Sequence, residues 1–150
     1  MNINEASDLL KDLVSQTDRK SELKIYHNFI GILTALKNRD LTREEARSIE
    51  EELDLLKLKE YPENKKKYLR RKLNEFKIYL KAEFSLISEG YYTGIGLALG
   101  MSFGVAIGAS IFGPSSGSGL GISLGMVVGL IIGRTMDSKA EKENRVLKVS

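Results

Sequence analysis

The sequence predicts an all-α protein in which a small N-terminal helical bundle precedes a two-helix transmembrane hairpin. Three observations predict this fold class. Residues 90–133 contain no Asp, Glu, Lys, Arg or His, although 29% of the chain is charged. Glycine recurs every four residues within that stretch, whereas residues 1–89 carry apolar side chains at the three- and four-residue spacing of amphipathic helices. We therefore expect a cytoplasmic helical domain at 1–89, the hairpin at 90–134 and a polar tail at 135–150.

Composition limits the possible functions of the chain. Its 150 residues have room for one ordinary domain, or for a small domain with an appendage. The net charge is only +3, so we expect no nucleic-acid partner. The absence of cysteine excludes disulfides and thiolate metal sites. The first residues lack the basic and apolar regions of a signal peptide, so we place the N-terminal domain in the cytoplasm.

The first 60 residues predict three amphipathic helices. The first starts near Asn4, and Ser21 is a candidate N-cap for the second. Thr42 and Glu45 have the spacing of a capping box, in which the two side chains accept hydrogen bonds from free backbone N–H groups at the start of a helix. A third helix therefore starts at Thr42, and Tyr61–Pro62 ends it.

The fourth helix has the most regular pattern. It starts near Glu63, and Gly90 suits its C-cap. Its apolar residues follow each other at steps of three and four, at Leu69, Leu73, Phe76, Leu80, Phe84 and Ile87. Four amphipathic helices with short connections favour a small bundle. A bundle of this size buries only a modest core, so packing against another copy or a partner would stabilise it.

The start of this helix is basic. Its cations are Lys65, Lys66, Lys67, Arg70, Arg71 and Lys72. Such a face is attracted to anionic lipid headgroups, each charge contributing about 1 kcal/mol near a membrane. The same residues also fit an ordinary solvated helix start, and the sequence leaves both interpretations open.

Nothing in the sequence predicts catalysis, a cofactor or a metal site. His27 is the only histidine and has no orienting partner nearby in the sequence. The GxG at Gly94 and Gly96 lacks the preceding strand, the third glycine and the later acidic residue of a dinucleotide-binding fingerprint. We therefore expect a protein that is not an enzyme.

The charge-free block is long enough to cross a bilayer twice. Residues 94–112 would span about 28 Å as a helix, close to the ~30 Å thickness of the hydrocarbon. A second run, 117–133, follows the turn Gly113–Ser116 and ends before Arg134, which can reach the interface. Cations flank both runs but not the turn, which places both termini in the cytoplasm and the hairpin in the cytoplasmic (inner) membrane. We expect residues 137–150 to form a short helix that docks on the N-terminal bundle, or to remain disordered.

The glycine spacing predicts close helix packing. The two series are Gly96, Gly100, Gly104 and Gly108, then Gly117, Gly121, Gly125, Gly129 and Gly133. Small residues let helix backbones approach closely in lipid, where the backbone hydrogen bonds hold regardless of helix propensity. The first run has a second small series on nearly its opposite face, at Ala98, Ser102, Ala106 and Ser110. One face can close the hairpin while the other meets a second subunit, so we expect a homo-oligomer.

Two alternatives compete with the helical hairpin. Small and large residues alternate over much of 94–126, which is a strand pattern, but each run is nearly twice the length of a membrane β-strand. The block can also be a buried glycine-rich hairpin in a soluble assembly.

The pattern GxGxALGMxFGxAxG, a turn, GLGxxLGMxxGxxIG and RxMDxKA resembles bacterial glycine-zipper membrane proteins, over residues 90–147. This resemblance implies a membrane hairpin that self-associates, and some proteins of this kind permeabilise membranes. The second run departs from the pattern at Val127 and Ile131, where its opposite face is bulky. The leading hypothesis is a self-assembling membrane protein that forms a pore or channel in the lipid bilayer. The alternative is a membrane-anchored scaffold whose helical domain recruits a protein partner.

Overall fold

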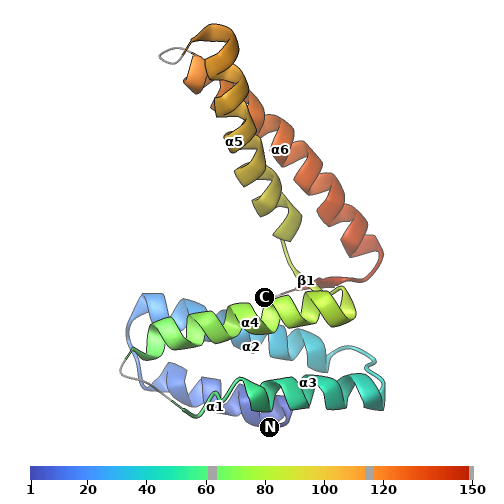
Figure 1. Cartoon of the computed structure of the whole chain (residues 1–150). Coiled ribbons are helices and arrows are strands. Elements are labelled where there is room, and N and C mark those ends of the chain that lie inside the picture. Colours follow the sequence, from blue (N-terminus) through green and yellow to red (C-terminus); the bar gives the residue numbers. More distant parts are fainter. Residues whose placement is uncertain (61–63, 114–116, 149–150) are drawn as a thin grey trace. The chain divides into compact units, whose positions relative to one another are not determined.

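The computed structural model of the chain describes residues 1–60, 64–113 and 117–148, and divides into two compact units (Figure 1). Unit 1 comprises residues 1–88 and 147–150, and unit 2 comprises residues 89–146. Helices dominate both, which confirms the all-α prediction.

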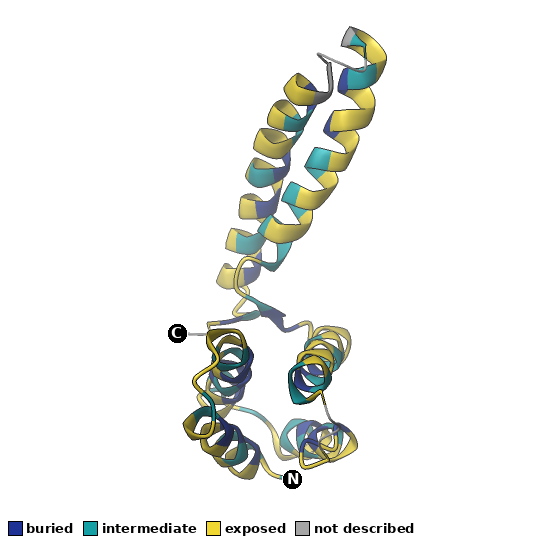
Figure 2. Ribbon diagram, turned by 90° about the vertical axis from the view of Figure 1, so that its left-hand side faces the viewer, coloured by how far each residue is buried: buried dark blue, intermediate teal, exposed yellow. Residues whose placement is uncertain are grey.

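Unit 1 is a helical bundle, as predicted. Its helices are α1 (Ile3–Ser15), α2 (Lys20–Lys37), α3 (Arg43–Leu55) and α4 (Lys65–Phe84). Figure 2 shows that the buried sides of these helices face one another. The fully buried aromatic side chains at the centre are Tyr26, Phe29 and Phe76, and the rings of Phe29 and Phe76 lie 5.6 Å apart between centroids.

The helix starts in unit 1 follow local hydrogen bonding. Thr42 and Glu45 form the predicted capping box, with the Thr42 N–H donating to Glu45 Oε2 at 2.8 Å. A second capping box, which the sequence analysis missed, joins Asn2 and Glu5 at the start of α1. The prediction for Ser21 was wrong, because α2 begins one residue earlier and its N-cap is Arg19, which has no capping side-chain bond.

The third helix ends earlier than predicted. α3 stops at Leu55 and not at Tyr61–Pro62, because Lys57 turns into the left-handed region at φ 52°. α4 begins at Lys65, after Asn64, whose side chain accepts a hydrogen bond from the Lys67 N–H at 3.1 Å; the predicted start, Glu63, lies outside the described residues. The helix ends at Phe84, because Ser85 turns into the left-handed region at φ 55°. Gly90 is therefore not its C-cap.

The segment after α4 is extended rather than helical. Ile87 belongs to strand β1 (Ile87–Ser88), which pairs with β2 (Val146–Leu147). Leu147 is 2% exposed and packs in the core of unit 1, so the end of the chain completes that core. The predicted docking on the N-terminal bundle is thus confirmed for Leu147, but the docked residues form a strand and not a short helix.

Unit 2 consists of α5 (Tyr91–Phe112) and α6 (Gly117–Lys142). The block is thus helical and not a β-hairpin over the residues that the structure describes. Gly113 has φ 83°, a conformation that favours glycine, and residues 114–116 of the predicted turn lie outside the described part. α6 continues beyond the charge-free run, which ends at Gly133, because Arg134 and the residues after it remain helical to Lys142.

Candidate functional site: the α5–α6 hairpin

Glycines bring the backbones of α5 and α6 into direct contact. Gly96 faces Gly129, Gly100 faces Gly125, and Gly104 faces Gly121. A Cβ atom built on Gly100 would overlap the Gly125 carbonyl oxygen and lie 2.9 Å from its carbonyl carbon. The same holds in reverse for the glycines of α6. We call these three pairs the glycine interface.

The geometry of the glycine interface explains why no other residue fits there. In glycine a hydrogen takes the place of the Cβ atom, so each Cα–H bond of the interface points at a carbonyl oxygen of the opposite helix. Such Cα–H···O contacts recur at close helix–helix crossings and contribute about 0.5–1 kcal/mol each.

The remaining predicted glycines lie at the ends of this interface. A Cβ on Gly133 would lie 2.5 Å from Thr93 Cα, and a Cβ on Gly121 would lie 3.0 Å from Gly108 Cα. Gly117 is the first residue of α6, and its surroundings are not described. Two glycines outside the four-residue series, Gly94 and Gly119, have open space where a Cβ would be added.

The second small series of α5 lies on the side away from α6. Its members are each two residues from a glycine of the four-residue series of α5, about 200° around the helix, and all are exposed: Ala98, Ser102, Ala106 and Ser110. We call these four residues the back face. Its hydroxyls are already satisfied, since Ser102 donates to the Ala98 carbonyl at 2.9 Å and Ser110 to the Ala106 carbonyl at 2.8 Å. The back face thus presents small side chains and needs no water to satisfy its polar groups.

The two sides of the glycine interface are packed differently. On one side the large residues are 53–66% exposed and border a groove of about 540 Å³ with glycines at its floor. We call this side the open flank; it comprises Leu99, Phe103, Ile107, Ile111, Leu124, Val128 and Ile132. On the other side Leu97 and Met101 of α5 and Ile122 and Leu130 of α6 are only partly exposed.

A carboxylate closes the start of α5. Gly90, its N-cap, has no side chain to accept hydrogen bonds from the free N–H groups. Asp137 of α6 takes that role, accepting from the Tyr92 N–H at 3.0 Å and from the Thr93 N–H at 2.9 Å. The sequence analysis missed this residue. A signal was present in the sequence, because Asp137 is the first acidic residue after the charge-free block.

Arg145 lies just beyond the end of α6 and also contacts Tyr92 in the first turn of α5. Its Nε donates to Glu143 Oε2 at 2.7 Å. Hydrogen bonds to Glu143 first, and to Tyr92, raise the pKa of Arg145.

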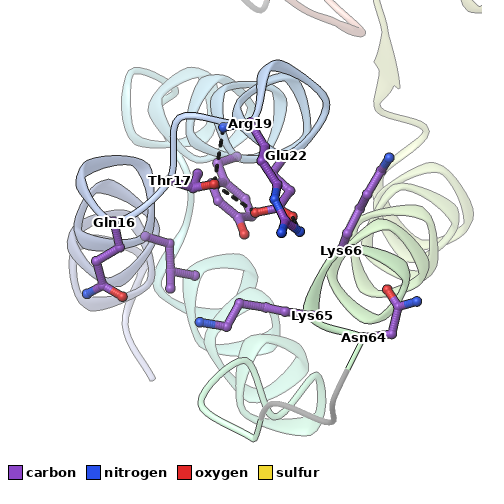
Figure 3. Close-up of a pocket in the computed structure, with 9 residues that line it drawn as sticks. Gln16, Thr17, Arg19, Glu22, Asn64, Lys65 and Lys66 are labelled. Carbon is purple, nitrogen blue, oxygen red and sulfur yellow. Dashed lines mark hydrogen bonds and ion pairs between the residues drawn. The ribbon is translucent and has the colours of Figure 1, made fainter.

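The six basic residues of α4 differ in their contacts. Arg71 and Lys72 pair with Glu75 at 3.4 and 2.8 Å, and both lie over the ring of Tyr68. Lys65 and Lys66 border a hollow of about 770 Å³ beside the α1–α2 turn (Figure 3).

The hollow in Figure 3 has mixed charge. Arg19 and Glu22 form an ion pair at 3.3 Å, and the Thr17 hydroxyl donates to Glu22 at 2.9 Å. Lys67, Arg70 and Arg71 together line a second hollow of α4. Contact of these cations with a membrane surface stays a prediction.

Comparison of the chain with protein-family models, with curated proteins and with solved structures finds no match.

The strongest feature is the exposure of the hairpin. α5 and α6 each contain a segment long and apolar enough to cross a membrane, Tyr91–Ile111 and Gly119–Lys142, and few residues of either are buried. A core helix of a soluble protein would be mostly buried. Large apolar surfaces of this kind mark membrane or protein contacts.

Unit 1, by contrast, has little exposed apolar surface. Among its described residues the large aliphatic side chains that are exposed are Leu55 at 71% and Ile78 at 59%, which come from different helices. An adaptor that recruits a partner through an apolar stripe on α3 or α4 would need more than these two.

Proposed function

We propose that the chain is an integral protein of the cytoplasmic membrane, inserted through the α5–α6 hairpin with both termini in the cytoplasm. Copies assemble into an oligomer and permeabilise the bilayer as a pore or channel, without enzymatic activity. The observation that carries this proposal is that the glycine interface is used within one chain, while the back face of α5 stays exposed.

Insertion into a membrane is supported by the exposed apolar side chains of the hairpin and by its internally hydrogen-bonded polar groups. Burying apolar area contributes about 25 cal/mol per Å², so the uncovered side chains of the open flank favour hydrocarbon over water. Backbone polar groups within a helix are already hydrogen-bonded, and the described serine hydroxyls at positions 102, 110 and 123 bond to carbonyls of their own helix.

Assembly is supported by the size of the back-face residues. Ala and Ser at four-residue intervals permit close approach of a second helix, which drives association in lipid. The matching positions of α6, Ser123, Val127 and Ile131, become bulky along the helix. The contact between copies is therefore assigned to α5.

The test separates hairpin closure from assembly. Purified chain is reconstituted in liposomes for dye release and sized in a neutral detergent. Ala106→Leu blocks the back face and is expected to abolish both the oligomer and release. The matched control is Val127→Leu, which adds bulk where α6 is already bulky and should leave both unchanged.

Two results would contradict the proposal. Intact liposomes at saturating wild-type protein, with Gly104→Leu no different, would exclude permeabilisation. A wild-type monomer in detergent, together with capture of a protein partner by residues 1–89 alone, would favour the scaffold alternative.

A further inference from the structure

A small polar hollow of about 250 Å³ lies between α2 and α4 in unit 1. Its polar lining consists of Ser21, Lys24 and Asn28 from α2 and of Arg70, Asn74 and Lys77 from α4. We call it the α2–α4 hollow. Residues at steps of three and four share one face of a helix, so two helix faces converge on it.

The charges of the α2–α4 hollow are all positive. Lys24, Arg70 and Lys77 line it, and no carboxylate does. Within the described residues none of these three cations forms an ion pair, whereas Arg71 and Lys72 share Glu75. Like charges around one hollow repel each other, so a bound anion would stabilise the arrangement.

Two groups in the hollow are poorly solvated. Burial lowers the pKa of the Lys77 ammonium, because the charged form loses part of its hydration there. Asn28 Oδ1 is buried and has no hydrogen-bond partner in the described structure. Rotation of the amide by half a turn replaces this oxygen with the Nδ2 donor. Buried polar atoms without a partner are rare in folded proteins, and a ligand is one explanation.

We propose that the α2–α4 hollow binds a phosphate group, either as free phosphate or as the headgroup of a phosphomonoester lipid. A phosphomonoester carries a charge of about −1.5 to −2 and three strong acceptor oxygens, which match three cations with hydroxyl and amide donors. Arg70 can hold two of these oxygens at once through its planar fork.

The size of the hollow agrees with this ligand class. Pockets for drug-sized molecules measure about 300–1,000 Å³, and the α2–α4 hollow is smaller. Ile25 and Leu73, both buried in the core of unit 1, also line it. The site lies wholly within unit 1 and does not depend on pore formation.

The experiment uses the full chain in a neutral detergent at fixed ionic strength. Calorimetric titrations compare inorganic phosphate, dihexanoyl phosphatidic acid and, as a zwitterionic control, dihexanoyl phosphatidylcholine. Binding by inorganic phosphate identifies a site for the free ion, and binding by phosphatidic acid alone identifies a headgroup site. Because a hydrogen bond to a charged group is worth about 1.5–3 kcal/mol, Arg70→Gln should weaken binding about tenfold or more.

The matched control has the same change in net charge. The variant Lys24→Gln/Arg70→Gln/Lys77→Gln should lose binding, whereas Lys37→Gln/Arg43→Gln/Lys59→Gln should stay within about twofold of wild type, since screening weakens distant exposed charges. Circular dichroism checks that both fold. The proposal is overturned if neither phosphate ligand binds, if both triple variants lose affinity equally, or if phosphatidylcholine binds as tightly as phosphatidic acid.

Discussion

Gly100→Ala tests the glycine interface most directly. The added methyl group would lie 2.9 Å from the Gly125 carbonyl carbon and 3.1 Å from Gly129 Cα, with the Gly125 oxygen closer still. Carbon atoms pack best at about 3.5–4.0 Å. All three obstructing atoms belong to the backbone of α6, so no side-chain rotation can relieve the overlap. The helices must move apart.

The magnitude follows from two opposing terms. Alanine gains up to about 1 kcal/mol in helix propensity over glycine. Against this, overpacking costs about 1–3 kcal/mol. If α5 and α6 separate by about 0.5–1 Å to make room, each van der Waals contact between them loses about a quarter to a half of its energy. The overpacking cost less the propensity gain leaves a loss of up to about 2 kcal/mol in hairpin stability, to which the weakened contacts add. Gly94→Ala, on the same helix with open space at the Cβ position, should be neutral or stabilising.

Two measurements test this prediction: the distance between α5 and α6, and the stability of the hairpin. The chain has no native cysteine, so spin labels at Ile95→Cys and Ile131→Cys, both exposed, report the α5–α6 distance by pulsed electron paramagnetic resonance. Titration of detergent micelles with sodium dodecyl sulfate gives the stability. The reasoning is refuted if Gly100→Ala keeps both the wild-type distance and midpoint, or if Gly94→Ala loses as much stability.

Three further predictions concern other contacts. Asp137→Ala removes the acceptor for the Tyr92 and Thr93 N–H groups and should destabilise the α5–α6 hairpin by about 0.5–2 kcal/mol in the same titration, whereas Ser138→Ala should not. Leu147→Ala empties a site in the core of unit 1 and should cost about 2–5 kcal/mol by thermal unfolding. Hydrogen bonds from the Thr42 backbone first, and its side chain, lower the pKa of Glu45. The ionised Glu45 carboxylate therefore stabilises unit 1 fully above the ordinary carboxyl pKa, and this stabilisation disappears as the pH falls through the lowered pKa of the folded state. Glu45→Gln should reduce the fall in stability at acid pH, and an unchanged fall would contradict the prediction.

The helices and the bundle were predictable because their signals are local. The Thr42 capping box needs only two side chains three residues apart, and the apolar spacing of α4 fixes its buried face. The end of α4 was not predictable in this way. Its apolar pattern continues to Ile87, but the Leu86 N–H bonds to the Leu80 carbonyl at 3.1 Å around left-handed Ser85, and both Leu86 and Ile87 are buried. The strand pairing that follows requires residues from the far end of the chain.

The register of the hairpin shows a second limit of the sequence. A series of glycines at four-residue intervals looks the same after a shift of four, so its pattern cannot say which glycine faces which. Contacts outside the series distinguish the registers: Asp137 binds the first turn of α5, and Gly133 fits against Thr93. Losing Asp137 should therefore broaden the α5–α6 distance distribution more than it lowers helix content.

The glycines of the glycine interface pack within one chain, so self-assembly needs a different contact surface. A glycine whose Cα–H bond already points at a carbonyl of its own hairpin cannot make the same contact with a second copy. If copies exchanged α5 and α6 helices, the same glycine pairs would form between chains, and substitutions at Gly104 and Ala106 would then disrupt the oligomer alike. If each chain keeps its own hairpin, Ala106→Leu disperses the oligomer while the Ile95–Ile131 distance within a chain stays unchanged. Dilution of spin-labelled chain with unlabelled chain separates the two cases, because only an exchanged pair loses its distance signal.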